Sequence, residues 1–172
     1  MSMSVGTLIP VGEYLKTSYH PDREYRDGVV TERNVGDKAH SRMQRQLTRY
    51  LGNRAKHWQI EVYPELRIRA REDWYPIPDV CVYPLPEPEG RVPTTMPLLW
   101  IEILSHDDRM VEVLQKARDL VECGAAYVWI IEPNSLESQL MTASGGPNQV
   151  PGKTLAIPGT PIVIPLADVM EE

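Results

Sequence analysis

The sequence LLWIEILS at residues 98–105 is the stretch that decides the fold, because it is an apolar run interrupted by a single carboxylate, Glu102. Pro97 precedes the run, and the polar sequence SHDD ends it at residues 105–108. Such a run is typical of a strand buried on both faces in the middle of a sheet. An ionised carboxyl group at that position is costly unless it has a partner. We therefore expect Glu102 to meet a cation, a metal ion or a proton, and we expect the chemistry of the protein there.

Length and composition are those of one globular domain. The chain has 172 residues, of which 42% are hydrophobic and 24% charged, and no internal repeat or linker divides it. Cys81 and Cys123 lack the spacing of zinc ligands. There is no signal-peptide pattern at the N-terminus and no apolar window of about 18 residues. We expect a single domain over residues 1–172, in a reduced, cytoplasmic setting.

Positive charge is concentrated in about one fifth of the chain. The net charge is −6, yet residues 38–71 hold nine Lys or Arg against only Glu61 and Glu65. This asymmetry indicates a basic face for an anionic partner, although solvated basic helix faces are also common.

Hydrophobic periodicity and turn residues predict the elements of the first half of the chain. The Asp27-Gly28 pair is the strongest short hairpin signal, and residues 34–37 supply turn and N-cap chemistry. The expected elements are a helix at 11–17, strands at 22–26 and 28–33, a helix at 38–57, strands at 59–63 and 65–70, and a strand at 79–83.

The second half begins with a proline-rich loop at 84–95. After the central strand, Asp107 and Asp108 are expected to cap a helix at 109–123, whose inward face would carry Val111, Leu114 and Val121 and which Gly124 would close. The remaining expected elements are a strand at 127–131, weaker strands at 136–142, 153–157 and 161–164, and a last helical turn at 165–170.

The helix expected at 38–57 has two different faces. Its apolar residues gather on one side, and its arginines on the other: Met43, Leu47, Tyr50 and Leu51 against Arg42, Arg45 and Arg49. His40 falls on the inward side, where a histidine is more often a hydrogen-bonded core residue than a functional one.

Two carboxylates and one amine form the candidate site. Side chains alternate along a strand, so Asp79 and Glu102 can converge if their strands are neighbours in the right register. Lys116 lies 14 residues after Glu102, on the helix expected to pack against this sheet. Oxygen ligands suit Mg²⁺, and an ammonium group can stabilise developing charge or orient water. This is the set of groups that a metal-dependent phosphodiesterase needs.

Each member of this set has a structural alternative. Asp79 follows a proline and can be a turn residue at the start of a strand. Glu102 can form a structural ion pair with a buried Arg or Lys. Lys116 can be a solvated helix residue. The occurrence of all three in this order is what favours the functional interpretation.

The chain also resembles a known family. The residues that carry the resemblance are EYRDGVV at 24–30, His40, PDVCV at 78–82, IEILS at 101–105, Lys116, and Gly124 followed by YVWIIEP at 127–133. In this order they are similar to the Uma-type family of putative restriction endonucleases, which lies within the PD-(D/E)XK nuclease superfamily. The resemblance extends from about residue 10 to residue 170.

The resemblance implies an α/β (mixed α+β) restriction-endonuclease-like fold, with a central mixed sheet flanked by helices, an N-terminal hairpin and a C-terminal β extension. It implies Asp79 and Glu102 as metal ligands, with Ile103 as a further metal-binding position. Lys116 would be the catalytic lysine, since Leu104 occupies the superfamily's usual lysine position and the family is thought to have moved the lysine to the following helix. Glu24 and His40 match the N-terminal motif and would complete the site.

Other enzyme classes lack their motifs. Ser105 is not in a G-x-S-x-G elbow, no glycine-rich phosphate loop is present, and the four histidines do not form a metal-binding pattern. The rival to a nuclease is a non-catalytic protein of the same fold that binds nucleic acid or a protein partner.

We therefore expect a Mg²⁺-dependent (alternatively Mn²⁺-dependent) endonuclease acting on DNA. Phosphates would lie along the arginines of the 38–57 helix or near Arg67 and Arg69. Cleavage of both strands needs two sites, so a homodimer is expected.

Overall fold

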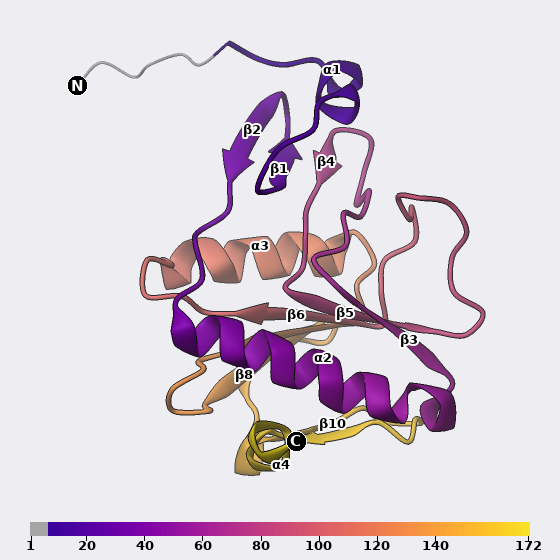
Figure 1. The fold of residues 1–172 in the computed structure, drawn as a ribbon, viewed down its shortest axis with the longest axis vertical. Helices are drawn as coiled ribbons and strands as arrows, with labels where there is room; N and C mark the ends of the chain where they lie inside the picture. The colour runs from indigo at the N-terminus through magenta and orange to yellow at the C-terminus, as the bar shows by residue number, and fades with distance from the viewer. Residues whose placement is uncertain (1–6) are drawn as a thin grey trace.

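A six-stranded mixed sheet, with helices on both faces, organises the computed structural model, which describes residues 7–172 (Figure 1). The strands, in spatial order, are β3 (Ile60–Pro64), β5 (Val80–Pro84), β6 (Leu99–Ile103), β7 (Tyr127–Ile131), β8 (Ser138–Thr142) and β9 (Gly145–Gln149). Strands β6 and β7 are parallel, and every other neighbouring pair is antiparallel. The apolar run at 98–105 thus forms a central strand, as predicted, with another strand on each side.

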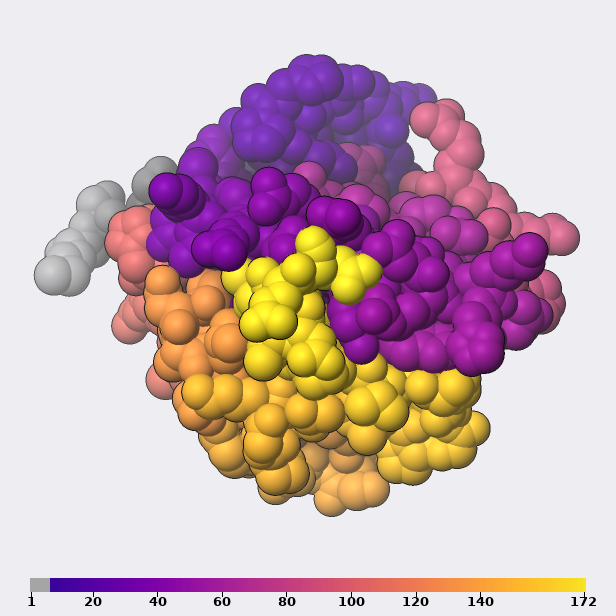
Figure 2. Space-filling view, turned by 60° about the horizontal axis from the view of Figure 1, so that its bottom comes forward, coloured from indigo at the N-terminus to yellow at the C-terminus, as the bar shows by residue number. Residues whose placement is uncertain are grey.

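Helices α2 (Lys38–Trp58) and α3 (Met110–Glu122) cover opposite faces of this sheet. Helix α3 is the crossover that a parallel β6–β7 pair requires. On the other face, α2 shares a core with the C-terminal hairpin of β10 (Thr154–Ala156) and β11 (Val163–Pro165) and with α4 (Leu166–Glu171). A short 3₁₀ turn, η1 (Pro151–Lys153), precedes the hairpin. Figure 2 shows the C-terminal segment, in yellow, lying against the purple surface of α2.

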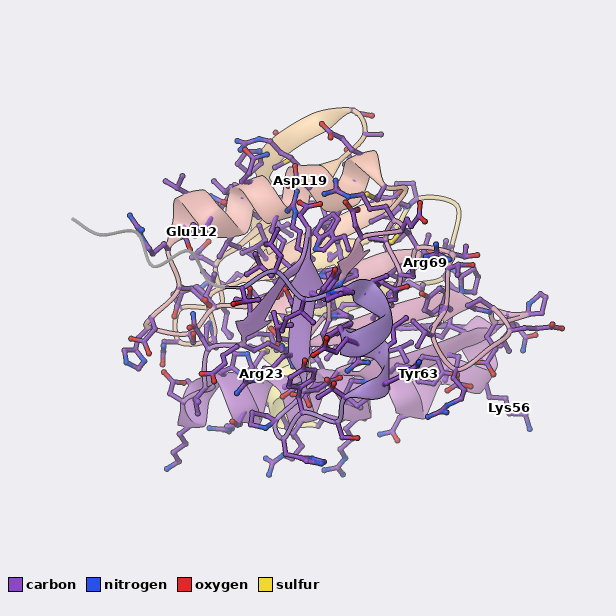
Figure 3. All side chains as sticks on the ribbon, turned by 90° about the horizontal axis from the view of Figure 1, so that it is seen from above. Arg23, Lys56, Tyr63, Arg69, Glu112 and Asp119 are labelled. Atoms are coloured by element: carbon purple, nitrogen blue, oxygen red, sulfur yellow. The ribbon has the colours of Figure 1, made fainter. Side chains whose placement is uncertain are left out.

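A small N-terminal layer lies above the main sheet in Figure 1. It contains α1 (Val11–Lys16) and a three-stranded sheet of β2 (Val29–Glu32), β1 (Arg23–Arg26) and β4 (Trp74–Tyr75). A cluster of buried tyrosines, Tyr14, Tyr25 and Tyr75, packs this layer together. Arg26 of β1 is ion-paired with Asp119 of α3 at 2.7 Å, which ties the layer to the main body. Asp119 is labelled on α3 in Figure 3.

Most of the predicted elements are confirmed, including the Asp27-Gly28 hairpin and the long helix, whose first turn is capped by the Asp37 carboxylate accepting from the His40 N–H. Two short strands, β4 and β9, were not predicted. The strand predicted at 65–70 is wrong. Glu65 has a φ of 50°, and the N–H groups that follow donate to separate segments: Ile68 to Pro76 and Arg69 to Pro93.

The prediction for α3 was wrong in two details. Its N-cap is Arg109, because the Asp108 carboxylate instead accepts hydrogen bonds from the N–H and hydroxyl of Ser105. Val111 is 81% exposed, and the fully buried residues of α3 are Ala117 and Leu120. Leu114 and Val121 pack against the core that contains these two residues, as predicted, so only Val111 was wrongly placed on the inward face.

We expect the C-terminal hairpin to be an integral part of the core under α2. Ile164 is completely buried, whereas its neighbour Val163 is 44% exposed on the other face of β11. Ile164→Ala should lower the free energy of unfolding by about 2–5 kcal/mol, because it opens a cavity in the core. Val163→Ala, measured beside it by urea denaturation, should cost less than about 1 kcal/mol. Equal losses in the two variants would contradict this assignment.

Candidate active site

Asp79 and Glu102 lie side by side because of the register between β5 and β6. The antiparallel pairing matches Val80 with Ile101 and Cys81 with Trp100, so the next pair along is Asp79 and Glu102. The Asp79 N–H donates to the Ile101 carbonyl at 3.1 Å, which continues the pairing past the end of β5. The two carboxylates therefore lie on the face of the sheet that α3 covers, as alternation predicted.

Lys116 of α3 joins two carboxylates. Its Nζ lies 2.8 Å from Oε1 of Glu102 and 2.8 Å from Oε1 of Glu24, which belongs to β1. The indole N–H of Trp100 also donates to Oε1 of Glu102, at 2.8 Å, and the Ile77 N–H donates to Glu24 at 3.0 Å. Lys116, Glu24 and Glu102 form a triad, and each of these side chains is at least three-quarters buried.

The charges of the triad shift the pKa values of Glu102 and Lys116. Burial raises the pKa of Glu102 above its usual range, and the Lys116 ammonium opposes that rise only in part. Burial lowers the pKa of Lys116, but the charges of Glu102 and Glu24 outweigh it and raise that pKa. Lys116 is consequently an ammonium ion at neutral pH, between two acidic partners.

Asp79 has a separate set of partners. Its Oδ1 accepts a hydrogen bond from Arg33 Nη2 at 2.8 Å and lies 3.3 Å from His40 Nε2, while its Oδ2 accepts from the Ile103 N–H at 2.7 Å. Burial alone raises the pKa of Asp79, but the contacts with His40, Ile103 and Arg33 outweigh it and hold that pKa below its usual range.

His40 is held between Asp79 and the backbone of the preceding turn. Burial lowers the pKa of His40, and its hydrogen bond and charge interaction with Asp79 more than offset this, so the pKa is raised. A Cβ at Gly36 would lie 2.5 Å from Nδ1 of the ring, so only glycine leaves room for His40 there.

These groups surround a cavity of about 110 Å³. All five residues expected to be catalytic line it, together with Ile103. The cavity is also lined by Glu32, Arg33, Asn34, Ser105 and Asp108, none of which was predicted from the sequence to belong to the site. No local sequence pattern marks Arg33 or Asp108 as a site residue. The partner of Arg33 is Asp79 and that of Asp108 is Asn34, and only the fold brings these pairs together.

The basic residues expected to bind phosphates do not all lie together. Arg42, Arg45 and Arg49 are exposed on α2, and the last two line an open groove of about 470 Å³ with Glu65. Arg67 is instead ion-paired with Asp22 and stacked on Tyr14.

Arg69 does not line the cavity either. Figure 3 shows it on the side of the molecule opposite to Glu112 of α3, a residue that lines a groove next to the site.

Oxygen donors are present in the cavity, but in the part of the chain that the structure describes they do not form a complete cage for a cation. Among the described residues no group of three or more His, Cys, Asp or Glu is arranged to hold a metal ion. Within residues 7–172, however, Oε2 of Glu102 receives no hydrogen bond, and Asp79 opens into the same cavity. Two carboxylates with room for retained waters match the way Mg²⁺ is usually bound.

Comparisons with known proteins identify the family of this chain. The family model of Uma2, described as "Putative restriction endonuclease", matches residues 13–161. The chain belongs to this family. None of the curated proteins matches the chain.

A solved structure shares the fold of this Uma2 chain. A putative nuclease belonging to DUF820 from Anabaena variabilis ATCC 29413 superposes with a TM-score of 0.80 at 20% identity, over 95% of this chain and 98% of that one. The restriction-endonuclease-like fold expected from the sequence is thereby confirmed. Within residues 7–172, no helix has the length and apolar character needed to cross a membrane.

The triad predicts a large effect of removing its cation. Lys116→Met should lower the free energy of unfolding by about 3–5 kcal/mol at pH 8, because Glu24 and Glu102 would face each other buried and uncompensated. The pKa of Glu102, already raised, should rise further, so the loss should shrink as the pH falls through that pKa. Denaturant unfolding at pH 8 and pH 5 measures both effects.

Two controls accompany this measurement. Adding Glu102→Gln to Lys116→Met should recover part of the stability, because it removes one of the two stranded charges. Lys153→Met removes a lysine that is 46% exposed and paired with Glu137, and it should change stability by about 1 kcal/mol or less. A Lys116→Met loss no larger than that of Lys153→Met would show that the triad is not a coupled unit.

Proposed function

We propose that this protein is a divalent-metal-dependent endonuclease that hydrolyses phosphodiester bonds in DNA. The observation that carries the proposal is the position of Lys116. Its ammonium group reaches Glu102 from a helix, 2.8 Å away, in the cavity that Asp79 also lines. A carboxylate pair with an ammonium group at one point is the minimal equipment for metal-assisted phosphodiester hydrolysis.

Asp79 and Glu102, with Ile103 beside them, are the residues that would hold Mg²⁺ or Mn²⁺. When bound, such a cation supplies Lewis acidity toward a phosphoryl oxygen and makes a water molecule more acidic. The hydrogen bond from Trp100 to Oε1 fixes the conformation of the Glu102 side chain, and it thereby also fixes the position of Oε2.

Lys116 has the position of a group that stabilises negative charge. It stays protonated because Glu102 and Glu24 raise its pKa, so it can donate hydrogen bonds to an anionic phosphate. Glu24 holds the ammonium group from the opposite side, and the Ile77 N–H fixes Glu24. Preorganised donors of this kind cost no reorganisation during the reaction.

The arginines of α2 offer a path for the DNA backbone. Gln44, which lies in the groove lined by Arg45 and Arg49, donates to the Asp79 carbonyl at 3.0 Å and to Glu65 at 3.3 Å. Gln44 therefore links this groove to the backbone of Asp79. Cleaving both strands would need a second site, which a homodimer would supply.

The rival function is that of a nuclease-fold protein without catalysis. One observation favours it: Lys116 and Arg33 form ion pairs with Glu102 and Asp79, the two carboxylates that a metal ion would use. Measured activity separates the two proposals.

The test is a cleavage assay on plasmid and single-stranded DNA with Mg²⁺, with Mn²⁺ and with EDTA. We expect cleavage that EDTA abolishes, and a loss of roughly 100-fold or more in Asp79→Ala, Glu102→Ala and Lys116→Ala. Glu89→Ala, in the exposed proline-rich loop, is the matched control and should cleave like the parent. Circular dichroism confirms that each variant is folded. Activity that is unchanged in all three variants, or absent from the parent with both metals, would rule out the site.

Binding of DNA along α2 predicts a salt dependence. In Arg45→Gln and in Arg49→Gln, the slope of log K for DNA association against log salt concentration should be smaller in magnitude by about one unit than in the parent. Fluorescence anisotropy with a labelled duplex in Ca²⁺ measures it. Arg54→Gln, on the same helix but paired with Glu172, should leave the slope unchanged. An unchanged slope in Arg45→Gln and Arg49→Gln would exclude this face of α2.

A further inference from the structure

Arg33 is the one basic residue lining the cavity that neither the family motif nor the chemistry above uses. It follows β2 directly, in the connector 33–37 that leads to α2. Its Nη2 lies 2.8 Å from Oδ1 of Asp79, and its Nη1 lies 3.4 Å from Oε1 of Glu65. Arg33 therefore spans from the inside of the cavity to its rim.

The two partners of Arg33 have opposite surroundings. The Asp79 side chain is 6% exposed and that of Glu65 is 57% exposed. Leaving a buried carboxylate without its partner is costly, whereas an ion pair with an exposed carboxylate contributes little. The guanidinium group is therefore fixed chiefly by Asp79, and Glu65 can keep it at the rim when that contact is broken.

The carboxylate of Asp79 already has partners on both of its oxygens. Oδ1 already faces Arg33 and His40, and Oδ2 accepts from the Ile103 N–H. A divalent cation that used Asp79 as a ligand would approach a carboxylate whose charge Arg33 has neutralised, and it would be repelled by the guanidinium. A metal ion and the Arg33 guanidinium therefore compete for the Asp79 carboxylate.

The chain allows Arg33 to move without breaking a sheet. Residues 33–37 have no regular secondary structure, and the side-chain link nearest to Arg33 in this connector is the exposed hydrogen bond from Asn34 to Asp108. Lys116, in contrast, is on a packed helix between two carboxylates. Of the two cations of the cavity, Arg33 is the one that can exchange partners.

We propose that Arg33 is an exchangeable counter-ion of Asp79. In the metal-free protein it neutralises Asp79; it gives up this carboxylate when a divalent cation binds, and it then binds a phosphate of the nucleic acid. This inference rests on the proposed function, since it takes Asp79 as a metal ligand. It makes Arg33 a positioning residue without metal and a phosphate-binding residue with metal.

The first test is metal binding without DNA, measured as free Mn²⁺ by electron paramagnetic resonance. Arg33→Gln should bind Mn²⁺ on the order of tenfold more tightly than the parent, because the competing charge is gone. Arg33→Lys keeps the charge and should stay near the parent. Arg91→Gln removes an exposed arginine from the proline-rich loop and should bind as the parent does. An affinity of Arg33→Gln equal to or weaker than that of the parent would overturn the proposal.

The second test compares the DNA affinity of Arg33→Gln in Ca²⁺ with its affinity in EDTA, because a merely structural residue would give the same loss in both. In Ca²⁺, Arg33→Gln should bind duplex DNA roughly fivefold more weakly than the parent, and in EDTA the two should bind alike. Arg45→Gln is the control, and its loss should be present in both conditions. Equal losses for Arg33→Gln in Ca²⁺ and EDTA would overturn the exchange.

A measurement on the parent protein avoids any folding defect of the variant. The nitrogen NMR signals of the Arg33 guanidinium should shift when Mg²⁺ is added, and unchanged signals at saturating Mg²⁺ would overturn the proposal. Failure of this proposal differs from failure of the proposed function. If the parent cleaves DNA with Mg²⁺ while Arg33→Gln binds Mn²⁺ as the parent does, only the exchange is wrong. If no variant binds metal and the parent does not cleave, both are wrong.

Discussion

The burial of one carboxylate in the central strand is the constraint on which the rest of the structure depends. Glu102 lies between buried Ile101 and Ile103, and its charge must be neutralised where water is largely excluded. Lys116 does this from α3, at 2.8 Å. Because α3 is the crossover between parallel β6 and β7, the chain after Glu102 returns over the sheet within one helix. The neutralising lysine therefore comes from the very element that the sheet topology demands.

The N-terminal layer is part of the site and not an appendage to the fold. Its strand β1 supplies Glu24, which holds Lys116 from the other side, and the connector after β2 supplies Arg33. The tyrosine core of this layer and the Arg26–Asp119 pair fix it to the main body. The polar cavity is thus assembled from strands of two sheets and from two helices, α2 and α3.

The site keeps its two carboxylates apart in function by giving them different partners. Asp79 is served by groups from the connector and α2, and its pKa is lowered by His40, Ile103 and Arg33 against the effect of burial. Glu102 is served by α3 and its own strand, and burial raises its pKa. Two carboxylates in one cavity therefore differ in the direction of their pKa shifts, because their partners differ. The physical basis for giving Arg33 and Lys116 separate roles is their position: Arg33 lies in a connector without regular secondary structure, and Lys116 lies on a packed helix between two carboxylates.

The sequence by itself determined the central strand, the hairpin at Asp27-Gly28 and the long capped helix, whereas the convergence of Asp79 with Glu102 also needed the register between β5 and β6. These follow from periodicity, turn residues and strand alternation, which act over a few neighbouring residues. The strand expected at 65–70 was wrong because its alternation is real but its backbone N–H groups bond to Pro76 and Pro93, in separate segments. Only the tertiary structure decided the partners of the site. Arg33 meets Asp79 across 46 positions and Lys116 meets Glu24 across 92, and no local pattern encodes contacts at such separations.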